Sequence, residues 1–185
     1  MTKIRPTTLL ACALVALTAL ALATSATAAA ANTGGTSFVP PPPPPKKAKI
    51  VNGRAIAPAR APRRVKAAIA AANRIVRKPY VWGGGHGSFV AAGYDCSGAV
   101  SYALHGGRFL ASPMASGPLM TWGRKGPGRW ITVYAHGGHT YVVIAGLRFD
   151  TSMHDADAPG PGTGPRWSRT LRRSSAFVAR HPKSY

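Results

Sequence analysis

The stretch GYDCSGAVSYAL, residues 93–104, decides how the chain is interpreted. Asp95 can cap the N-terminus of a helix, and Gly106–Gly107 can end it. The apolar stripe of this predicted helix consists of Cys96, Ala99, Val100, Ala103 and Leu104. Cys96 therefore stands in the first helical turn, where it is a buried small hydrophobe, one half of a disulfide, or a nucleophile.

The position of the cysteine favours chemistry without proving it. A thiolate in the first turn of a helix faces unpaired backbone N–H groups and the positive end of the helix dipole, which stabilise the ionised sulfur. A cysteine on an apolar stripe also suits a packed core. A nucleophile needs a base as well, and the base must come from elsewhere in the chain.

The N-terminal segment is typical of a secretory signal peptide. Lys3 and Arg5 precede an apolar stretch over residues 9–23, and Ala26-Thr27-Ala28 offers a cleavage site. An apolar run of roughly 15 residues is short for a membrane span, which needs about 20. Removal of residues 1–28 is therefore favoured over retention as an anchor. The mature protein is expected to be secreted, extracellular or associated with the cell wall, with no membrane span.

Cleavage would also settle the disulfide question. Cys12 lies inside the predicted signal peptide, so Cys96 would be the one cysteine of the mature chain. An intramolecular disulfide would then be impossible, and a single thiol in an exported protein is either buried or reactive.

Residues 29–62 have the composition of a disordered linker. They are rich in Pro and Ala, and Pro40–Pro45 form an uninterrupted run that favours an extended polyproline II conformation. The segment is interpreted as a spacer, with a ligand for a proline-binding module as the alternative. One folded domain is predicted over residues 63–182.

The charge of the chain is strongly positive. It carries 24 Lys and Arg against 4 Asp and no Glu, a net charge of +20, or +18 once Lys3 and Arg5 are removed. No recognisable nucleic-acid module is present, so an anionic cell-wall polymer is the expected partner and nucleic acid is not. Surface solubility is the alternative reason for the charge. A monomer is expected.

Two further segments lie between the predicted linker and the cysteine helix. Residues 63–78, RRVKAAIAAANRIVRK, predict an amphipathic helix that stops before Pro79. Its apolar face consists of Val65, Ile69, Ala72 and Val76. Residues 79–89, PYVWGGGHGSF, follow as an irregular glycine loop that can bring Tyr80 and Trp82 close to the cysteine helix.

The base is predicted on a strand near the C-terminal half. Residues 128–138 read as a strand and a glycine turn, and residues 139–146, HTYVVIAG, read as a second strand opened by His139. Residues 147–152, LRFDTS, would pair with it through a turn at Gly146 and place Asp150 beside His139. Thiol, imidazole and carboxylate in this arrangement are what nucleophilic catalysis requires.

These motifs together resemble the NlpC-type cell-wall endopeptidases, a family of papain-like cysteine peptidases. The family pattern is an aromatic PYxWGG segment, an Asp-Cys-Ser-Gly helix start and a histidine that opens a strand, and all three occur here in order over residues 64–152. The resemblance implies an α+β, papain-like fold, in which an N-terminal nucleophile helix packs on a small antiparallel sheet.

The resemblance also implies roles for individual residues. Cys96 matches the nucleophile, His139 the general base, and Tyr80 the tyrosine near the thiol. In place of the family's usual third residue, a histidine, the chain has Asp150, which could accept a hydrogen bond from the Nδ1–H of His139. Thr151 is the alternative if the register shifts by one residue.

The implied reaction is hydrolysis of an amide bond in a peptidoglycan stem peptide through a thioacyl intermediate. Backbone N–H groups at the helix start, with Tyr80, Asp95 and Ser97 around them, would bind substrate and the oxyanion. No cofactor or metal is required. The His136-x-x-His139 spacing is a weak zinc pattern, since a flexible glycine pair separates the two rings.

Some departures keep other functions open. The family often has an acidic residue after Pro-Gly in the segment before the base strand, where this chain has Pro127-Gly128-Arg129. The alternatives are an amidase or transpeptidase, a catalytically silent wall-binding protein of the same fold, and a cationic secreted factor that acts on membranes.

Overall fold

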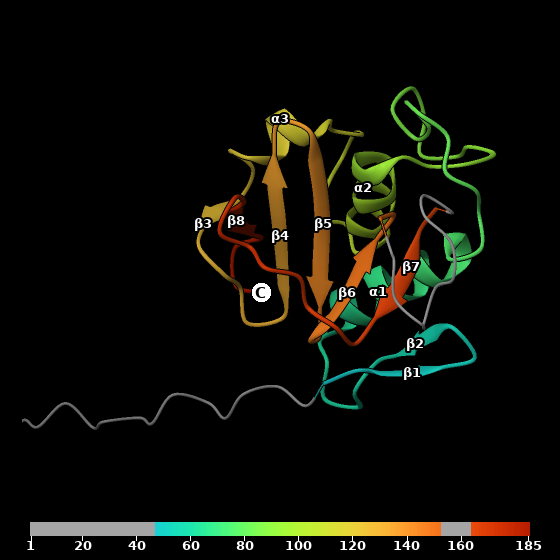
Figure 1. Cartoon of the computed structure of the whole chain (residues 1–185). Coiled ribbons are helices and arrows are strands. Elements are labelled where there is room, and N and C mark those ends of the chain that lie inside the picture. The colour runs from blue at the N-terminus through green and yellow to red at the C-terminus, as the bar shows by residue number, and fades with distance from the viewer. Residues whose placement is uncertain (1–46, 153–163) are drawn as a thin grey trace, which may run out of the picture. The chain divides into compact units, whose positions relative to one another are not determined.

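The computed structural model describes residues 47–152 and 164–185, and Figure 1 shows how their elements are arranged. The predicted signal peptide and residues 29–46 of the predicted linker lie outside these ranges. The helices are α1 (Arg63–Ile75), α2 (Cys96–Gly106) and α3 (Ser116–Leu119). The strands are β1 (Lys49–Val51), β2 (Arg54–Ile56), β3 (Arg124–Lys125), β4 (Ile131–His136), β5 (His139–Ile144), β6 (Leu147–Asp150), β7 (Arg166–Ser168) and β8 (Val178–His181). Among these helices, none is both long and apolar enough to cross a membrane.

A six-stranded antiparallel sheet forms the centre of the domain. Its strand order is β3-β8-β4-β5-β6-β7, and β1 pairs only with β2. Strands β5 and β6 pair with Ile144 opposite Leu147, so Ala145 and Gly146 form a two-residue turn. Both have positive φ, 48° and 79°, as a tight hairpin turn requires. The three strands predicted between residues 128 and 152 are confirmed.

Helix α2 packs against β5 and β6, and α1 packs against α2 (Figure 1). The apolar faces predicted for the two helices are both buried, with only Cys96 partly exposed. Small side chains allow the helices to approach closely, since a Cβ on Gly106 would lie 2.2 Å from the Cβ of Ala71. The α+β fold class, with the cysteine helix packed on an antiparallel sheet, is confirmed.

The folded domain begins earlier than predicted. The predicted linker extends to residue 62, but the hairpin β1–β2 lies within it and buries Ala48 and Ala55. Asn73 of α1 fixes this hairpin, because its amide accepts from the backbone N–H of Ala55 (2.9 Å) and donates to its carbonyl (2.8 Å). Alanines that bury little apolar area leave a weak pattern, so composition alone did not reveal the hairpin.

The C-terminal end of the domain also lies beyond the predicted residue 182. The carbonyl of Tyr185 accepts a hydrogen bond from the backbone N–H of Arg129 at 3.1 Å. The Tyr185 ring packs edge-on against Phe109, with 4.9 Å between ring centroids. The described chain is therefore folded up to residue 185.

The start of α2 is held against the glycine loop by a contact that only glycine permits. A Cβ added to Gly98 would lie 1.9 Å from the carbonyl oxygen of Gly84 and 3.1 Å from Gly85 Cα. The same carbonyl of Gly84 accepts the N–H of Asp95 at 3.2 Å. The loop therefore sets the position of the helix start.

We expect Gly98→Ala to destabilise the protein by about 3 kcal/mol, because a backbone carbonyl must move to admit the methyl group. The expected loss in melting temperature is roughly 10 °C. Gly117→Ala is the matched control, since nothing lies within 4 Å of a Cβ there. Thermal unfolding followed by circular dichroism measures both. An unchanged melting temperature for Gly98→Ala would show that the glycine loop moves to admit the methyl group at little cost.

Candidate active site

Cys96 is the first residue of α2, and Asp95 caps the helix in front of it. The Asp95 carboxylate accepts the backbone N–H of Gly98 at 2.8 Å and that of Gly83 at 3.1 Å. The predicted N-cap is thus confirmed, and the same carboxylate also ties the glycine loop to the helix. Cys96 is a free thiol, and its side chain is partly exposed.

His139 lies between Cys96 and Asp150. Its Nε2 is 3.0 Å from Asp150 Oδ1, and the Cys96 side chain lies close enough to contribute to the raised pKa of the imidazole. The Asp150 side chain is fully buried and that of His139 is 17% exposed. The structure therefore brings together the thiol, the imidazole and the carboxylate that the sequence singled out.

One detail of the predicted hydrogen bond is wrong. The carboxylate was expected to accept from Nδ1 of His139, but Nε2 is the nitrogen that faces Asp150. His139 opens β5, and Asp150 ends the neighbouring strand β6, so the far side of the ring reaches the carboxylate. Nδ1 is left as the nitrogen available to the sulfur.

The neighbours of His139 shift its pKa strongly. Burial by itself lowers the pKa of the imidazole, but hydrogen bonds to Asp150 and Cys96, together with the negative charge on both, raise it to about 9. Burial raises the pKa of Asp150, and the hydrogen bond and charge of His139 outweigh it, so that this pKa falls to about 2. The pair is therefore ionic over the neutral pH range.

This ion pair predicts a pH dependence of stability. The pKa of His139 is raised from 6.5 to about 9, so its contribution is complete below pH 6.5 and is lost as the pH rises through 9. A shift of this size corresponds to about 3 kcal/mol. The pKa of Asp150 is lowered from 3.8 to about 2, so the pair also weakens as the pH falls below 3.8.

We expect the difference in melting temperature between wild type and Asp150→Asn to be largest from pH 4 to 6.5, and to shrink as the pH rises through about 9, where the contacts of Asp150 with Ser152 and Arg172 remain. Calorimetry of both proteins across this range measures it. A difference that stays constant with pH would mean that the two groups do not titrate as a pair.

Two residues that the sequence analysis missed hold Asp150. Ser152 donates to Asp150 Oδ1 through its backbone N–H (3.0 Å) and its hydroxyl (3.1 Å), and the hydroxyl lies 3.3 Å from His139 Nε2. Arg172 donates to Ser152 Oγ at 2.9 Å and lies 3.4 Å from Asp150 Oδ2. Both carboxylate oxygens are thus engaged, which fixes the orientation of the group that faces His139.

An aromatic wall completes this side of the site. The ring of Phe177 lies 4.4 Å from that of His136 and 6.3 Å from that of His139, between centroids. The Arg172 guanidinium lies 5.3 Å from the Phe177 ring centroid and 5.6 Å from that of Tyr141. The Phe177 ring therefore covers one side of His139.

His86 of the glycine loop lines the cleft beside Cys96. Its Nε2 lies 2.9 Å and 3.1 Å from the two oxygens of Asp95 and 2.8 Å from Ser97 Oγ. Asp95 and Ser97, predicted as substrate and oxyanion contacts, are themselves buried and bonded to each other at 3.2 Å. His86, with a side chain 36% exposed, is the member of this group that faces outward.

A cleft of about 330 Å³ opens beside the sulfur. It is lined by Trp82, Gly83, His86, Asp95, Cys96, Ser97, Ala115, Ser116, Gly137 and Gly138. Trp82, one of these lining residues, is 86% exposed. Burial, and then the charges of Cys96 and Asp95, raise the pKa of the Tyr80 hydroxyl. Tyr80 therefore lies within electrostatic range of the thiol.

The remaining candidates take no place beside the thiol. Thr151 is buried, and Asp150 is the residue that bonds His139. The His136 ring lies 6.4 Å from that of His139 and accepts the N–H of Gly138. Within residues 47–152 and 164–185, no group of three or more His, Cys, Asp or Glu could hold a metal ion. His154, Asp155 and Asp157 lie outside those ranges.

Comparisons with known proteins find a similarity of fold only. No family model and no curated protein sequence matches this chain. The chain is similar to the structure of Rv1477, a hypothetical invasion protein of Mycobacterium tuberculosis, at 24% identity and a TM-score of 0.46. The match covers 65% of this chain and 65% of that one. It is also similar to a variant of the resuscitation promoting factor interacting protein RipA, at 22% identity and a TM-score of 0.46, over 74% of this chain and 69% of that one. These values say nothing about a reaction, so the chemistry of the site rests on its own side chains.

Proposed function

We propose that the chain is a secreted cysteine peptidase that hydrolyses amide bonds in peptidoglycan stem peptides. The observation that carries the proposal is the position of His139, which bonds the buried Asp150 carboxylate and whose pKa is also raised by the neighbouring Cys96 side chain. A thiol at a helix start, paired with an imidazole that a carboxylate orients, is the constellation for nucleophilic attack on an acyl group.

The first half of the reaction forms a thioester. His139 takes the proton of the Cys96 thiol, which gives a thiolate beside an imidazolium. The thiolate of Cys96 attacks the amide carbon, and the carbonyl oxygen gains the negative charge. His139 then gives its proton to the leaving amine, and the C–N bond breaks.

The second half regenerates the thiol pair. The now neutral His139 takes a proton from water, and the resulting hydroxide attacks the thioester carbonyl. The C–S bond breaks, the peptide leaves as a carboxylic acid, and the imidazolium returns its proton to the sulfur to restore the thiol. Asp150, held at both oxygens, keeps the ring in place throughout and stabilises its positive charge whenever it is protonated.

The cleft supports a peptide-like substrate. The oxyanion would form next to the first turn of α2, where backbone N–H groups have no helical acceptor, and close to the hydroxyl of Tyr80. The exposed indole of Trp82 and the imidazole of His86 line the approach to the sulfur. A cleft that opens at the surface suits an extended segment of a polymer better than an enclosed small molecule.

Mass spectrometry of purified muropeptides tests the proposal. The full chain and its Cys96→Ser variant are each incubated with the same muropeptides. A new fragment that carries the mass of one added water and that only the wild type makes would support a peptidase and identify the bond. Identical spectra from two folded proteins would overturn it in favour of a wall-binding protein of this fold.

The acceptor decides between hydrolase and transferase. The same digestion with an added amine nucleophile, such as glycine amide, reveals transfer as a fragment that carries the mass of the amine in place of water. Fragments with water alone support hydrolysis, and amine adducts in large excess would assign a transpeptidase.

A further inference from the structure

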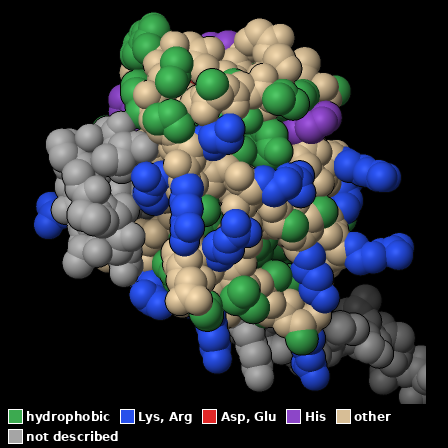
Figure 2. Space-filling model, turned by 90° about the vertical axis from the view of Figure 1, so that its right-hand side faces the viewer, with side chains coloured by type: hydrophobic (Ala, Val, Ile, Leu, Met, Phe, Trp, Pro, Cys, Tyr) green, Lys and Arg blue, Asp and Glu red, His purple; other side chains and the backbone are tan. Residues whose placement is uncertain are grey.

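The described surface carries positive charge that no carboxylate neutralises outside the site. Residues 47–152 and 164–185 hold 21 Lys and Arg, the 24 of the chain less Lys3, Arg5 and Lys46. The same residues hold two side-chain carboxylates, Asp95 and Asp150, which are 5% and 2% exposed and lie in the site. On the face in Figure 2, Lys and Arg side chains spread over the middle and lower parts, beneath a group of hydrophobic ones.

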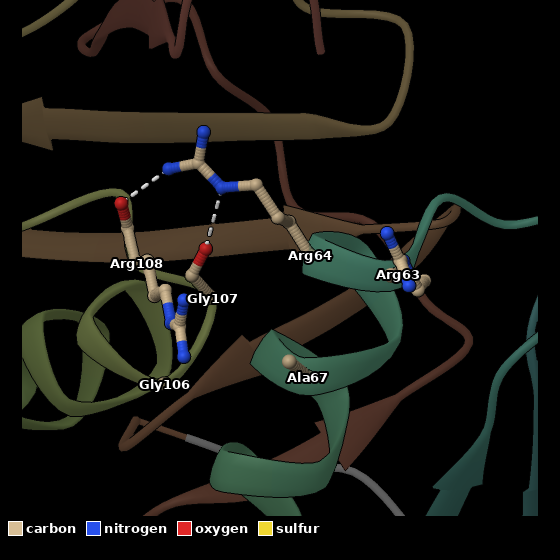
Figure 3. A pocket seen from close by; sticks show the side chains of 6 residues that line it. All are labelled: Arg63, Arg64, Ala67, Gly106, Gly107 and Arg108. Atoms are coloured by element: carbon tan, nitrogen blue, oxygen red, sulfur yellow. Dashed lines mark hydrogen bonds between the residues drawn. The ribbon is translucent and has the colours of Figure 1, made fainter.

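Some of this charge gathers in a groove between the start of α1 and the end of α2, which we call the arginine groove. It is lined by Arg63, Arg64, Ala67, Gly106, Gly107 and Arg108 and has a volume of about 470 Å³. Figure 3 shows Ala67 between Arg63 on one side and Arg108 on the other. The small side chains of the floor keep the groove open, while its rim is formed by guanidinium groups.

Arg64 is held in place before any ligand arrives. Its Nε donates to the carbonyl of Gly107 at 2.9 Å, one terminal nitrogen donates to the carbonyl of Arg108, and the guanidinium carbon lies 4.2 Å from the Phe109 ring centroid. The other terminal nitrogen points away from both carbonyls in Figure 3. A fixed guanidinium loses little conformational entropy on binding an anion.

The composition of the groove indicates the chemistry of its partner. Guanidinium groups present paired N–H donors that match the oxygens of phosphate, and 16 of the 24 basic residues in the chain are Arg. No aromatic ring is among the residues that line the groove, whereas proteins that bind single-stranded nucleic acids stack bases on such rings. The groove therefore suits phosphate groups on a backbone without bases.

A second basic hollow favours a polymer over a small ion. It has a volume of about 480 Å³ and is lined by Lys47, Lys49 and Arg169 together with small and aliphatic residues. A single phosphate would occupy one hollow, but a chain with a charge on every repeat can contact several. Repeated contacts raise the total affinity without any single strong site.

We propose that the arginine groove binds a linear phosphodiester polymer of the cell envelope, with a polyol backbone. The proposal is independent of the catalytic function, since none of the groove residues lies in the site. Such a contact would hold the protein on the wall while the cleft stays accessible to substrate.

Binding of poly(glycerol phosphate) to the full chain carrying Cys96→Ser tests this. Isothermal titration or fluorescence anisotropy measures the affinity of this chain and of two variants of it. The groove pair adds Arg63→Gln/Arg108→Gln. The control pair adds Arg124→Gln/Arg173→Gln, which removes the same charge from exposed positions outside the groove. We expect the groove pair to weaken binding about 10-fold and the control pair about 2-fold or less. The slope of log K against log salt should fall by about 1 to 2 for the groove pair only.

The other outcomes are equally defined. Equal losses for the two pairs would show attraction to the overall charge and overturn the proposal, as would equal affinity for single-stranded DNA per phosphate or tighter binding to vesicles of anionic lipid. Arg63→Lys/Arg108→Lys keeps the charge but loses the paired donors, so it should also weaken binding, and full affinity in this variant would overturn the recognition by guanidinium groups. Because the inactive chain is used, neither result depends on whether the protein cleaves peptides.

Discussion

The His139→Ala variant is expected to cleave stem peptides with a kcat/KM about 10³-fold to 10⁴-fold below that of the wild type. The imidazole takes part in both halves of the proposed reaction, first as the acid that protonates the leaving amine and then as the base that activates water. Its loss also removes the group that takes the proton of the Cys96 thiol. Initial rates of fragment formation at pH 7, measured by liquid chromatography and mass spectrometry, give the ratio.

His136→Ala provides the matched control for this variant. His136 stands opposite His139 at the β4–β5 turn, with 6.4 Å between ring centroids, and packs against Phe177. We expect it to change kcat/KM less than about 3-fold, because surface substitutions away from the reacting atoms have small effects. Alkylation of Cys96 by iodoacetamide at pH 6 should slow in His139→Ala only. Equal losses in the two variants would mean that the base lies elsewhere.

The Asp150→Asn variant is expected to lose about 10²-fold to 10³-fold in kcat/KM and to change the pH profile. The wild-type profile should fall on the alkaline side near pH 9, where His139 loses its proton. Without the negative charge of Asp150, this limb should move toward the ordinary histidine value of about 6.5. Rates measured from pH 5 to 10 follow the limb directly.

Thr151→Val separates the two candidates that the sequence left open for the third position. Thr151 is the next residue along the chain and is equally buried, so its substitution disturbs the same region without removing a charge. We expect kcat/KM to stay within about 3-fold of the wild type, with the alkaline limb in place. A loss as large as that of Asp150→Asn would place the orienting group at Thr151 instead.

The parts of the fold that the sequence predicted are those with local signals. Glycine pairs and alternating β-branched residues mark β4, β5 and β6, and Asp95 marks the start of α2. The position of Asp150 beside His139 followed from the short turn between their strands. Each of these features depends on residues a few positions apart, and local patterns record such features well.

Ser152 was missed although its signal was present. The register pairs Val142 with Phe149, and continuing it by three residues on each strand sets Ser152 opposite His139. Asp150 is then the diagonal neighbour on the same face, where a long side chain can still reach across. Counting from the two-residue turn would have identified both residues.

Other features could not be obtained from the sequence. Arg172 reaches Asp150 across 22 positions, and Asn73 fixes a hairpin 18 positions before it. His86 meets Asp95 because the glycine loop folds back on the helix start. The sequence gives no distances between separated segments, so contacts of this kind appear only when the whole domain is assembled.

The contact between Gly98 and the Gly84 carbonyl has a consequence for when the thiol becomes reactive. His139 and Asp150 belong to one hairpin with a two-residue turn, a unit of short range that can form early. Cys96 is 43 positions before His139 and meets it only after α2 has settled against the glycine loop and the sheet. In an unfolded or partly folded chain, Cys96 therefore lacks its base. The nucleophile and its base come together only in the assembled domain, so that the chain would gain its reactivity with its tertiary fold.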